Sequence, residues 1–381
     1  MLSSAKIGRS SWRYYQRTVA GGACEYYAEH GDTPGRWHGS GLAQLGLTAG
    51  AEVQERELEA LFGRALSPTT GAALGSAWRA DAVTGYDLTF SAPKSVSALW
   101  ALGDPRTGEV VAAAHGAAVK AALGYLERHA SLSRRGRDGV EQVASAGFAA
   151  ALFDHRTSRT GDPQLHTHAL VVNKVRCVDG AWRTWDGHEV FHHKKAAGVI
   201  YQAALRAELT AALPVGFVPV SENGQAEIAG VPDQLLSAWS TRTTAVLADA
   251  VPTIADAEGA LGRPVSAAER ARIIKTAVLA TRPVKDTGVD EGDLRARWVA
   301  QAAALGWDSD RLTHAVNAAA GSSPAAVGPG WEETVARDAV TAVGRSKAIW
   351  SRADLTVAIA ARIPTSGPGA PETARDAALV A

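Results

Sequence analysis

The chain has 381 residues, of which 46% are apolar and 20% are charged, and its formal net charge is zero. This composition suits a globular protein with a substantial core. It excludes a surface coated throughout with basic residues for nucleic-acid binding, but it does not exclude a local basic groove. Residues 1–6 lack the apolar core of a signal peptide, and no run of about 18 apolar residues occurs. We therefore expect a cytoplasmic protein that does not insert into membranes.

The first 200 residues or so mix helical and strand patterns. Helical spacing of apolar residues predicts helices over Glu52–Leu66 and over the alanine-rich segment Val110–His129, whereas Tyr86–Ser91 alternates like a strand. Farther along, Asp179-Gly180 supplies the positive backbone angles of a tight hairpin turn. Lys195–Leu213 again predicts a helix. These patterns indicate an α+β fold whose sheet is mostly antiparallel.

Three histidines, His155, His166 and His168, lie between these elements. His166 and His168 alternate at the period of a strand, so a strand would point both imidazoles at the same face. His155 ends the apolar run Ala146–Phe153, and the turn-forming segment 157–163 predicts that the two strands pair antiparallel. A lone histidine is more often an ordinary core or surface residue. Three on adjoining strands predict a metal site that leaves positions open for a substrate.

The second half of the chain is predicted to be almost entirely helical. A short hairpin is expected first, from Gly216–Val220 and Ala226–Ile228. Beyond Pro232 the helical segments are Asp233–Leu247, Ser266–Ala280, Asp290–Gly306 and a final piece, Trp331–Arg362. The tail from residue 363 to 381 is rich in proline and glycine, and we expect it to be disordered because it can bury little apolar surface.

Two tyrosine pairs stand near the start of the chain, Tyr14-Tyr15 and Tyr26-Tyr27. Taken alone, such pairs are ordinary aromatic core or interface residues. A phenol can also act as a nucleophile, although its usual pKa of about 10 then requires a nearby base, cation or metal-polarised electrophile. A divalent cation held by imidazoles would polarise a phosphate in this way. The tyrosines and histidines together indicate phosphodiester transesterification.

Several charged residues are further candidates for the site. Asp87 lies within an apolar strand, where a carboxylate is costly to bury unless it is paired, so it either orients a metal-bound histidine, accepts a phenol proton or faces solvent at the strand end. Lys94 either contacts a phosphate or caps a helix start. The candidate DNA-binding arginines are equally compatible with solvated surface charges, and they are Arg134, Arg135, Arg156 and Arg159.

These motifs resemble the conjugative relaxases of the MobF type, which are the relaxase domains of plasmid-transfer relaxase-helicases. The residues that carry the resemblance are the two tyrosine pairs, Asp32, Trp37-His38-Gly39, Leu45-Gly46-Leu47, Tyr86–Ser97 and the block Gln164–His168. They cover the chain to about residue 200. A fainter match at Thr281–Lys285 and Trp298 extends the resemblance to about residue 305.

The resemblance implies an α+β, HUH-type or palm-like fold, with a central antiparallel sheet, flanking helices and a helical C-terminal flank. It implies that Tyr14 attacks the scissile phosphate at an origin of transfer and stays joined to the DNA 5′ end, that Tyr26 serves the second strand transfer, and that Tyr15 and Tyr27 support them. Asp87 would assist proton transfer or position a histidine. His155, His166 and His168 would hold Mg²⁺ or Mn²⁺, with Zn²⁺ and Ni²⁺ as alternatives.

The same resemblance sets the expected organisation and partners. Residues 1–305 would form the relaxase domain, with the catalytic sheet to about residue 230 and a helical lid over 231–305, and 306–362 resembles the start of a segment that precedes the helicase. We expect a monomer that binds single-stranded origin DNA with an adjacent hairpin, together with accessory relaxosome proteins and a coupling protein. No Gly-x-x-x-x-Gly-Lys-Ser/Thr loop occurs, so ATP-driven unwinding is not expected.

Two other functions stay open at this stage. A metal-dependent hydrolase or oxygenase could use the same three histidines on a small substrate, which would leave the tyrosines without a role. A remnant that binds origin DNA without cutting it would keep the fold and the DNA contacts but lose the chemistry.

Overall fold

A five-stranded antiparallel sheet lies at the centre of the protein, in a computed structural model that describes residues 1–8, 34–221, 224–282, 291–321 and 330–363. Its strands, in spatial order, are β1 (Leu2–Gly8), β3 (Val83–Ser91), β7 (Pro163–Val172), β6 (Ala150–Thr157) and β2 (Arg36–His38). All four neighbouring pairs are antiparallel, which confirms the expected α+β fold.

The β6–β7 hairpin has the register that the histidine pattern predicts. His155 pairs directly with His166, and Phe153 pairs with His168. The strand begins at Ala150 and not at Ala146 as expected, because Gly147 has a φ of 101° and a Cβ there would lie 1.8 Å from Oγ of Ser40. This close approach ends the extended conformation on the N-terminal side of β6.

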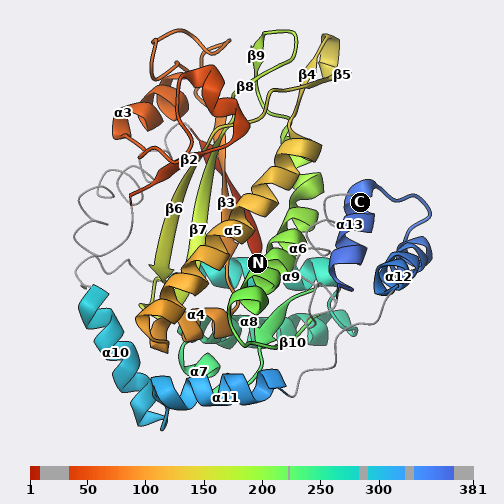
Figure 1. The fold of residues 1–381 in the computed structure, drawn as a ribbon. Coiled ribbons are helices and arrows are strands. Elements are labelled where there is room, and N and C mark those ends of the chain that lie inside the picture. Colours follow the sequence, from red (N-terminus) through yellow and green to blue (C-terminus); the bar gives the residue numbers. More distant parts are fainter. Residues whose placement is uncertain (9–33, 222–223, 283–290, 322–329, 364–381) are drawn as a thin grey trace.

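Two long helices, α5 (Pro105–Ala130) and α6 (Gly187–Ala212), lie together across one face of the sheet (Figure 1). The sheet contributes alternate side chains to this layer, including Leu88, Phe90 and Val171, which are fully buried in the main core. Helix α4 (Lys94–Leu102) follows β3 directly and packs at the end of the same layer. Both expected helices in this part of the chain are present, and each begins earlier than predicted.

An apolar cluster lies on the opposite face of the sheet. It is covered by η2 (Ser40–Leu45), α3 (Glu55–Leu58) and the π-helical turn η3 (Glu59–Arg64), which bury Trp37, Leu61 and Phe62 against Leu170 and Val172. The helix expected over Glu52–Leu66 is present but shorter, since it begins at Glu55, widens to a π-helical turn at Glu59 and ends before Ala65, which has a left-handed conformation. The three histidines lie on this face, outside that apolar cluster.

Three small hairpins complete the strand structure. They are β4 (Leu132–Arg135) with β5 (Glu141–Ala144), β8 (Val175–Arg176) with β9 (Trp182–Arg183), and β10 (Phe217–Pro219) with β11 (Ala226–Ile228). Gly180 has a φ of 82° in the turn between β8 and β9, as the Asp-Gly pair predicts. The hairpin at β10–β11 is confirmed as well.

The rest of the described chain is helical, as expected: α7 (Asp233–Ala238), α8 (Thr241–Leu261), α9 (Ala267–Ala280), α10 (Glu291–Ala304), α11 (Ser309–Gly321), α12 (Trp331–Ser346) and α13 (Arg352–Ala360). Two expected helices are interrupted. The first breaks after Ala238, where the fully buried Trp239 donates from its indole to Gln301. The second breaks at Lys347, which has extended backbone angles, and Ser351 then caps α13.

The main core crosses the boundary expected at residue 305. Trp298 of α10, Leu312 and Val316 of α11, and Ala353 of α13 all belong to the apolar cluster that contains the sheet. The expected disordered tail lies outside the described residues except for Ile363, which is buried. No helix in the described ranges has both the length and the apolar character needed to span a membrane.

Candidate metal centre and nucleic-acid interface

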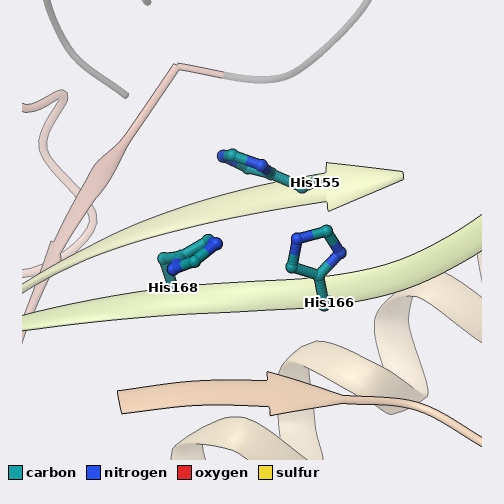
Figure 2. A group of neighbouring side chains, drawn as sticks. All are labelled: His155, His166 and His168. Atoms are coloured by element: carbon teal, nitrogen blue, oxygen red, sulfur yellow. The ribbon is translucent and has the colours of Figure 1, made fainter. Parts of the chain in front are cut away.

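His155, His166 and His168 meet on the face of the sheet opposite α5 and α6. Their ring centroids lie 4.9 to 5.3 Å apart, and one nitrogen of each ring lies within 4.8 Å of one nitrogen of the others (Figure 2). All three side chains are half-buried. No other group of three potential ligand side chains is this close anywhere in the described parts of the chain. The geometry follows from two adjoining strands in register, because side chains paired across strands are near neighbours.

Asp87 orients His168. The two residues lie on adjacent strands of the same face, and Nδ1 of His168 lies 2.9 Å from both carboxylate oxygens of Asp87. Thr89 donates to the same carboxylate at 3.1 Å. An imidazole whose Nδ1–H is donated to a carboxylate presents the lone pair of Nε2 on the other side of the ring, which is how carboxylates commonly fix metal-binding histidines.

His166 is fixed by the backbone. Its Nδ1 lies 2.9 Å from the carbonyl oxygen of Gln164, so it acts as the donor and Nε2 keeps its lone pair. Burial, reinforced by the neighbouring His168, lowers the pKa of His166 to about 3. The ring is therefore neutral at physiological pH, and a neutral imidazole is the form that binds a metal.

The donor set fits a divalent cation. Three imidazoles with a carboxylate behind one of them match a three-histidine site that keeps coordination positions for a substrate. Imidazole ligands accept several divalent metals, so the donor set leaves open which metal is bound.

Comparison with known proteins decides the family. The TrwC relaxase family profile matches residues 9–305. The chain belongs to the TrwC relaxase family.

Relatives of this family member are multifunctional conjugation proteins. TraI of Escherichia coli is 35% identical over 247 residues, which is 60% of this chain and 13% of that protein, and TraI of E. coli strain K12 is 34% identical over 241 residues. The chain thus spans about an eighth of the length of these relatives. A metal-bound conjugative relaxase TrwC in complex with oriT DNA is 30% identical, with a TM-score of 0.64 over 81% of this chain and all of that chain. A TrwC complex with a 27-mer that comprises the recognition hairpin and the cleavage site has a TM-score of 0.61 at the same identity and coverage.

A buried polar chain supports the histidine strands from behind in this TrwC-family structure. Thr167 lies between His166 and His168 but points to the α5 side of the sheet, where its hydroxyl donates to Asp154. His115 of α5 lies 2.8 Å from Oγ1 of Thr167 through Nε2, and 2.8 Å from the hydroxyl of Tyr201 through Nδ1. Burial lowers the pKa of His115 to about 4. A neutral His115 can therefore donate to Thr167 and accept from Tyr201.

This chain of side chains was not found from the sequence. One sequence signal could have indicated it. Asp154 and Thr167 are polar, and each is next to a histidine on its strand, so each side chain points to the face opposite the histidines. The second half of the network comes from α5 and α6, where His115 lies 52 residues before Thr167 and Tyr201 lies 34 residues after it. Only the packing of these helices on the sheet brings the groups together.

The turn between β6 and β7 is held by the helical flank. Asp162 is buried and accepts from both the backbone and the hydroxyl of Thr241 at the start of α8, at 3.1 and 3.0 Å. Trp298 of α10 donates its indole N–H to the carbonyl of Gly161 at 2.8 Å. The expected lid thus contacts the hairpin that carries His155 and His166.

The basic candidates differ in their surroundings. Lys94 donates to the carbonyl of Pro163 at 2.9 Å and does not cap α4. A cation at a helix N-terminus is unfavourable because the helix dipole is positive there. Arg134 pairs with Asp186 at 2.7 Å, and Arg135 pairs with Glu141 and Asp179. Their hairpin, β4–β5, lies beyond the end of the sheet opposite the β6–β7 turn (Figure 1). Arg156 lies over the ring of Trp100, and Arg159 lies in the β6–β7 turn.

The expected nucleophiles cannot be placed. Tyr14, Tyr15, Tyr26, Tyr27 and Asp32 lie outside the described residues.

Proposed function

We propose that this chain nicks one strand of DNA at an origin of transfer and transfers the cut strand. The observation that carries the proposal is the three-histidine cluster backed by Asp87, in a chain that belongs to the TrwC relaxase family. Solved relatives of this family hold oriT DNA, both with metal and without it. Together with the TrwC complex that holds the recognition hairpin and the cleavage site, these complexes support origin DNA with its hairpin, bound as a single strand, as the proposed substrate.

The chemistry proposed is transesterification. The phenol oxygen of Tyr14 forms a bond to the scissile phosphorus and gives up its proton, while the bond to the 3′ oxygen breaks and that oxygen takes up a proton. The products are a 5′-phosphotyrosine and a free 3′ hydroxyl. Tyr26 repeats the reaction for the second strand transfer, and Tyr15 and Tyr27 are assigned supporting roles.

His155, His166 and His168 are the residues proposed to hold the cation, which when bound supplies charge neutralisation at the non-bridging phosphate oxygens. Mg²⁺ or Mn²⁺ is the first choice for the reaction, and Zn²⁺ and Ni²⁺ are alternatives; one solved TrwC structure is a copper-bound form. For Asp87, the two contacts to Nδ1 of His168 favour positioning of the ring over acceptance of the phenol proton.

Arg156 and Arg159 are the proposed DNA contacts, because both lie at or beside the turn that follows His155. Lys94, Arg134 and Arg135 are weaker candidates, since Lys94 holds the backbone of Pro163 and the β4–β5 hairpin lies at the other end of the sheet (Figure 1). We propose a monomer that works with accessory relaxosome proteins and a coupling protein, and we propose residues 1–305 as the relaxase unit, onto whose core α11 and α13 also pack.

The test uses a pool of single-stranded oligonucleotides of random sequence with Mn²⁺. A covalent protein–DNA species on a denaturing gel, from which the attached sequence is read, is the expected result. It should vanish in Tyr14→Phe while DNA binding remains. A shift without covalent product would indicate a DNA-binding remnant, and the absence of both binding and product would favour a metal enzyme for small substrates.

His166→Ala and His168→Ala separate the metal from the nucleophile. Each should abolish the Mn²⁺-dependent product and leave the circular dichroism spectrum unchanged. Undiminished cleavage by either variant would remove the proposed role of the metal site.

A further inference from the structure

A second group of histidines lies in the first turns of α6, away from the proposed metal centre. The segment reads His188-Glu189-Val190-Phe191-His192, with two histidines four residues apart on one helical face. Their rings are parallel within 9°, and the centroids lie 6.3 Å apart. Both side chains are exposed, and that of His188 is 75% exposed. Exposed rings can change rotamer at little cost.

Glu189, between the two histidines, is held in place. Gln142 of β5 donates to its Oε1 at 3.0 Å, and Nδ1 of His188 lies 3.6 Å from the same oxygen. Its other oxygen lies 3.7 Å from Nε2 of the buried His193, whose Nδ1 contacts the hydroxyl of Tyr125 at 2.8 Å. The carboxylate thus sets a fixed negative charge beside the exposed imidazole of His188.

We propose that His188 and His192 form a second site, at the surface, for a divalent transition metal that imidazole favours, namely Ni²⁺, Cu²⁺ or Zn²⁺. Two histidines at this spacing on a helix are the metal-binding part of the His-Glu-x-x-His arrangement. Imidazole nitrogen is a ligand that suits all three of these ions. Glu189 adds electrostatic attraction for the cation.

The site binds a cation through two protein ligands and carries no peptidase chemistry. Hydrolytic zinc sites use three protein ligands. The only three potential ligand groups within 4.8 Å of one another in the described ranges are His155, His166 and His168. Glu189, which would be the general base of a peptidase, is already engaged by Gln142.

The two sites are on opposite sides of the sheet. Phe191, inside the histidine segment, packs edge-on against Tyr86 with centroids 6.1 Å apart, whereas the next residue of β3, Asp87, faces His168. Adjacent residues of a strand point to opposite faces. Binding at the α6 site therefore does not require the sheet site, and the two can be separated by mutation.

The experiment titrates the untagged full chain with Ni²⁺ by calorimetry and follows its retention on an immobilised Ni²⁺ column. His188→Ala and His192→Ala should each lose one class of binding site and elute earlier, while keeping the class that His166→Ala removes. His314→Ala removes a single exposed histidine of α11 and is the matched control, expected to behave as the parent chain. Binding and retention of His188→Ala and His192→Ala equal to those of the parent would overturn the proposal, as would loss of both classes in either variant with an unchanged circular dichroism spectrum.

Discussion

Both carboxylate oxygens of Asp87 lie 2.9 Å from Nδ1 of His168, across two adjacent strands. This contact leaves Nε2 of His168 as the nitrogen that can bind a metal. The other two histidines of the cluster, His155 and His166, lie on the same face of the sheet. A carboxylate that accepts a hydrogen bond from a metal-binding imidazole raises the basicity of the ring and fixes its orientation.

Asp87→Asn should weaken metal binding without unfolding the protein. The amide keeps the shape of the side chain but loses the negative charge that favours the Nδ1–H form, so we expect affinity for Mn²⁺ to fall by roughly tenfold to a hundredfold. Calorimetric titration measures this loss. Asp81→Asn, which changes an exposed carboxylate 80% open to solvent, is the control and should bind as before. An affinity in Asp87→Asn equal to that of the parent would refute the positioning role.

Thr167→Val should lower the free energy of unfolding by about 1–3 kcal/mol, since it leaves the buried His115 and the partly buried Asp154 without the hydroxyl between them. Urea denaturation followed by circular dichroism gives the value. Thr276→Val, at an exposed position on α9 where the hydroxyl bonds to its own helix, should change stability by no more than about 0.5 kcal/mol. Equal effects of the two substitutions would show that the buried chain adds nothing to stability.

Lys94 should make stability depend on pH above neutrality. Burial lowers its pKa to about 8, and the charges of Asp162 and Glu227 oppose this shift only in part. Both states hold the proton below pH 8, whereas between about 8 and 10.5 the unfolded chain keeps a proton that the native protein has released. Unfolding free energy should therefore rise with pH in this window, by no more than about 3 kcal/mol.

Lys94→Met provides the comparison for this effect. The substitution removes the titrating group, so the parent should gain stability relative to the variant as the pH increases. Urea titrations at pH 7, 8, 9 and 10 measure the difference. A constant difference across these values would contradict the lowered pKa.

Trp298→Ala should destabilise the contact between the helical flank and the β6–β7 turn. The side chain is 1% exposed and packs edge-on against Trp100 at 5.8 Å, so its removal should cost about 3–5 kcal/mol of unfolding free energy. Trp298→Phe keeps most of the packing but loses the hydrogen bond to Gly161, and it should cost less. Chemical denaturation measures both losses. If Trp298→Phe lost as much unfolding free energy as Trp298→Ala, the hydrogen bond and not the packing would stabilise the contact with the helical flank.

Local patterns identified much of the fold because they depend on near neighbours. The alternation of His166 and His168 and the turn formers of 157–163 predicted the hairpin and its register, and Asp179-Gly180 predicted a second turn. Errors arose where a distant contact overrides local preference. Ser40 approaches Gly147 and delays the start of β6, and the burial of Trp239 interrupts a helix that is continuous by pattern.

The sequence by itself determined the three histidines, Asp87 and their placement on strands, since strand periodicity assigns each side chain to a face. It left open whether Asp87 meets a histidine, a phenol or solvent. Tertiary structure decided this, because the pairing of β3 with β7 sets Asp87 beside His168. It also brought His115 and Tyr201 behind Thr167, and Trp298 onto the hairpin turn. Contacts between residues far apart in sequence depend on how whole elements pack, and no local pattern encodes that packing.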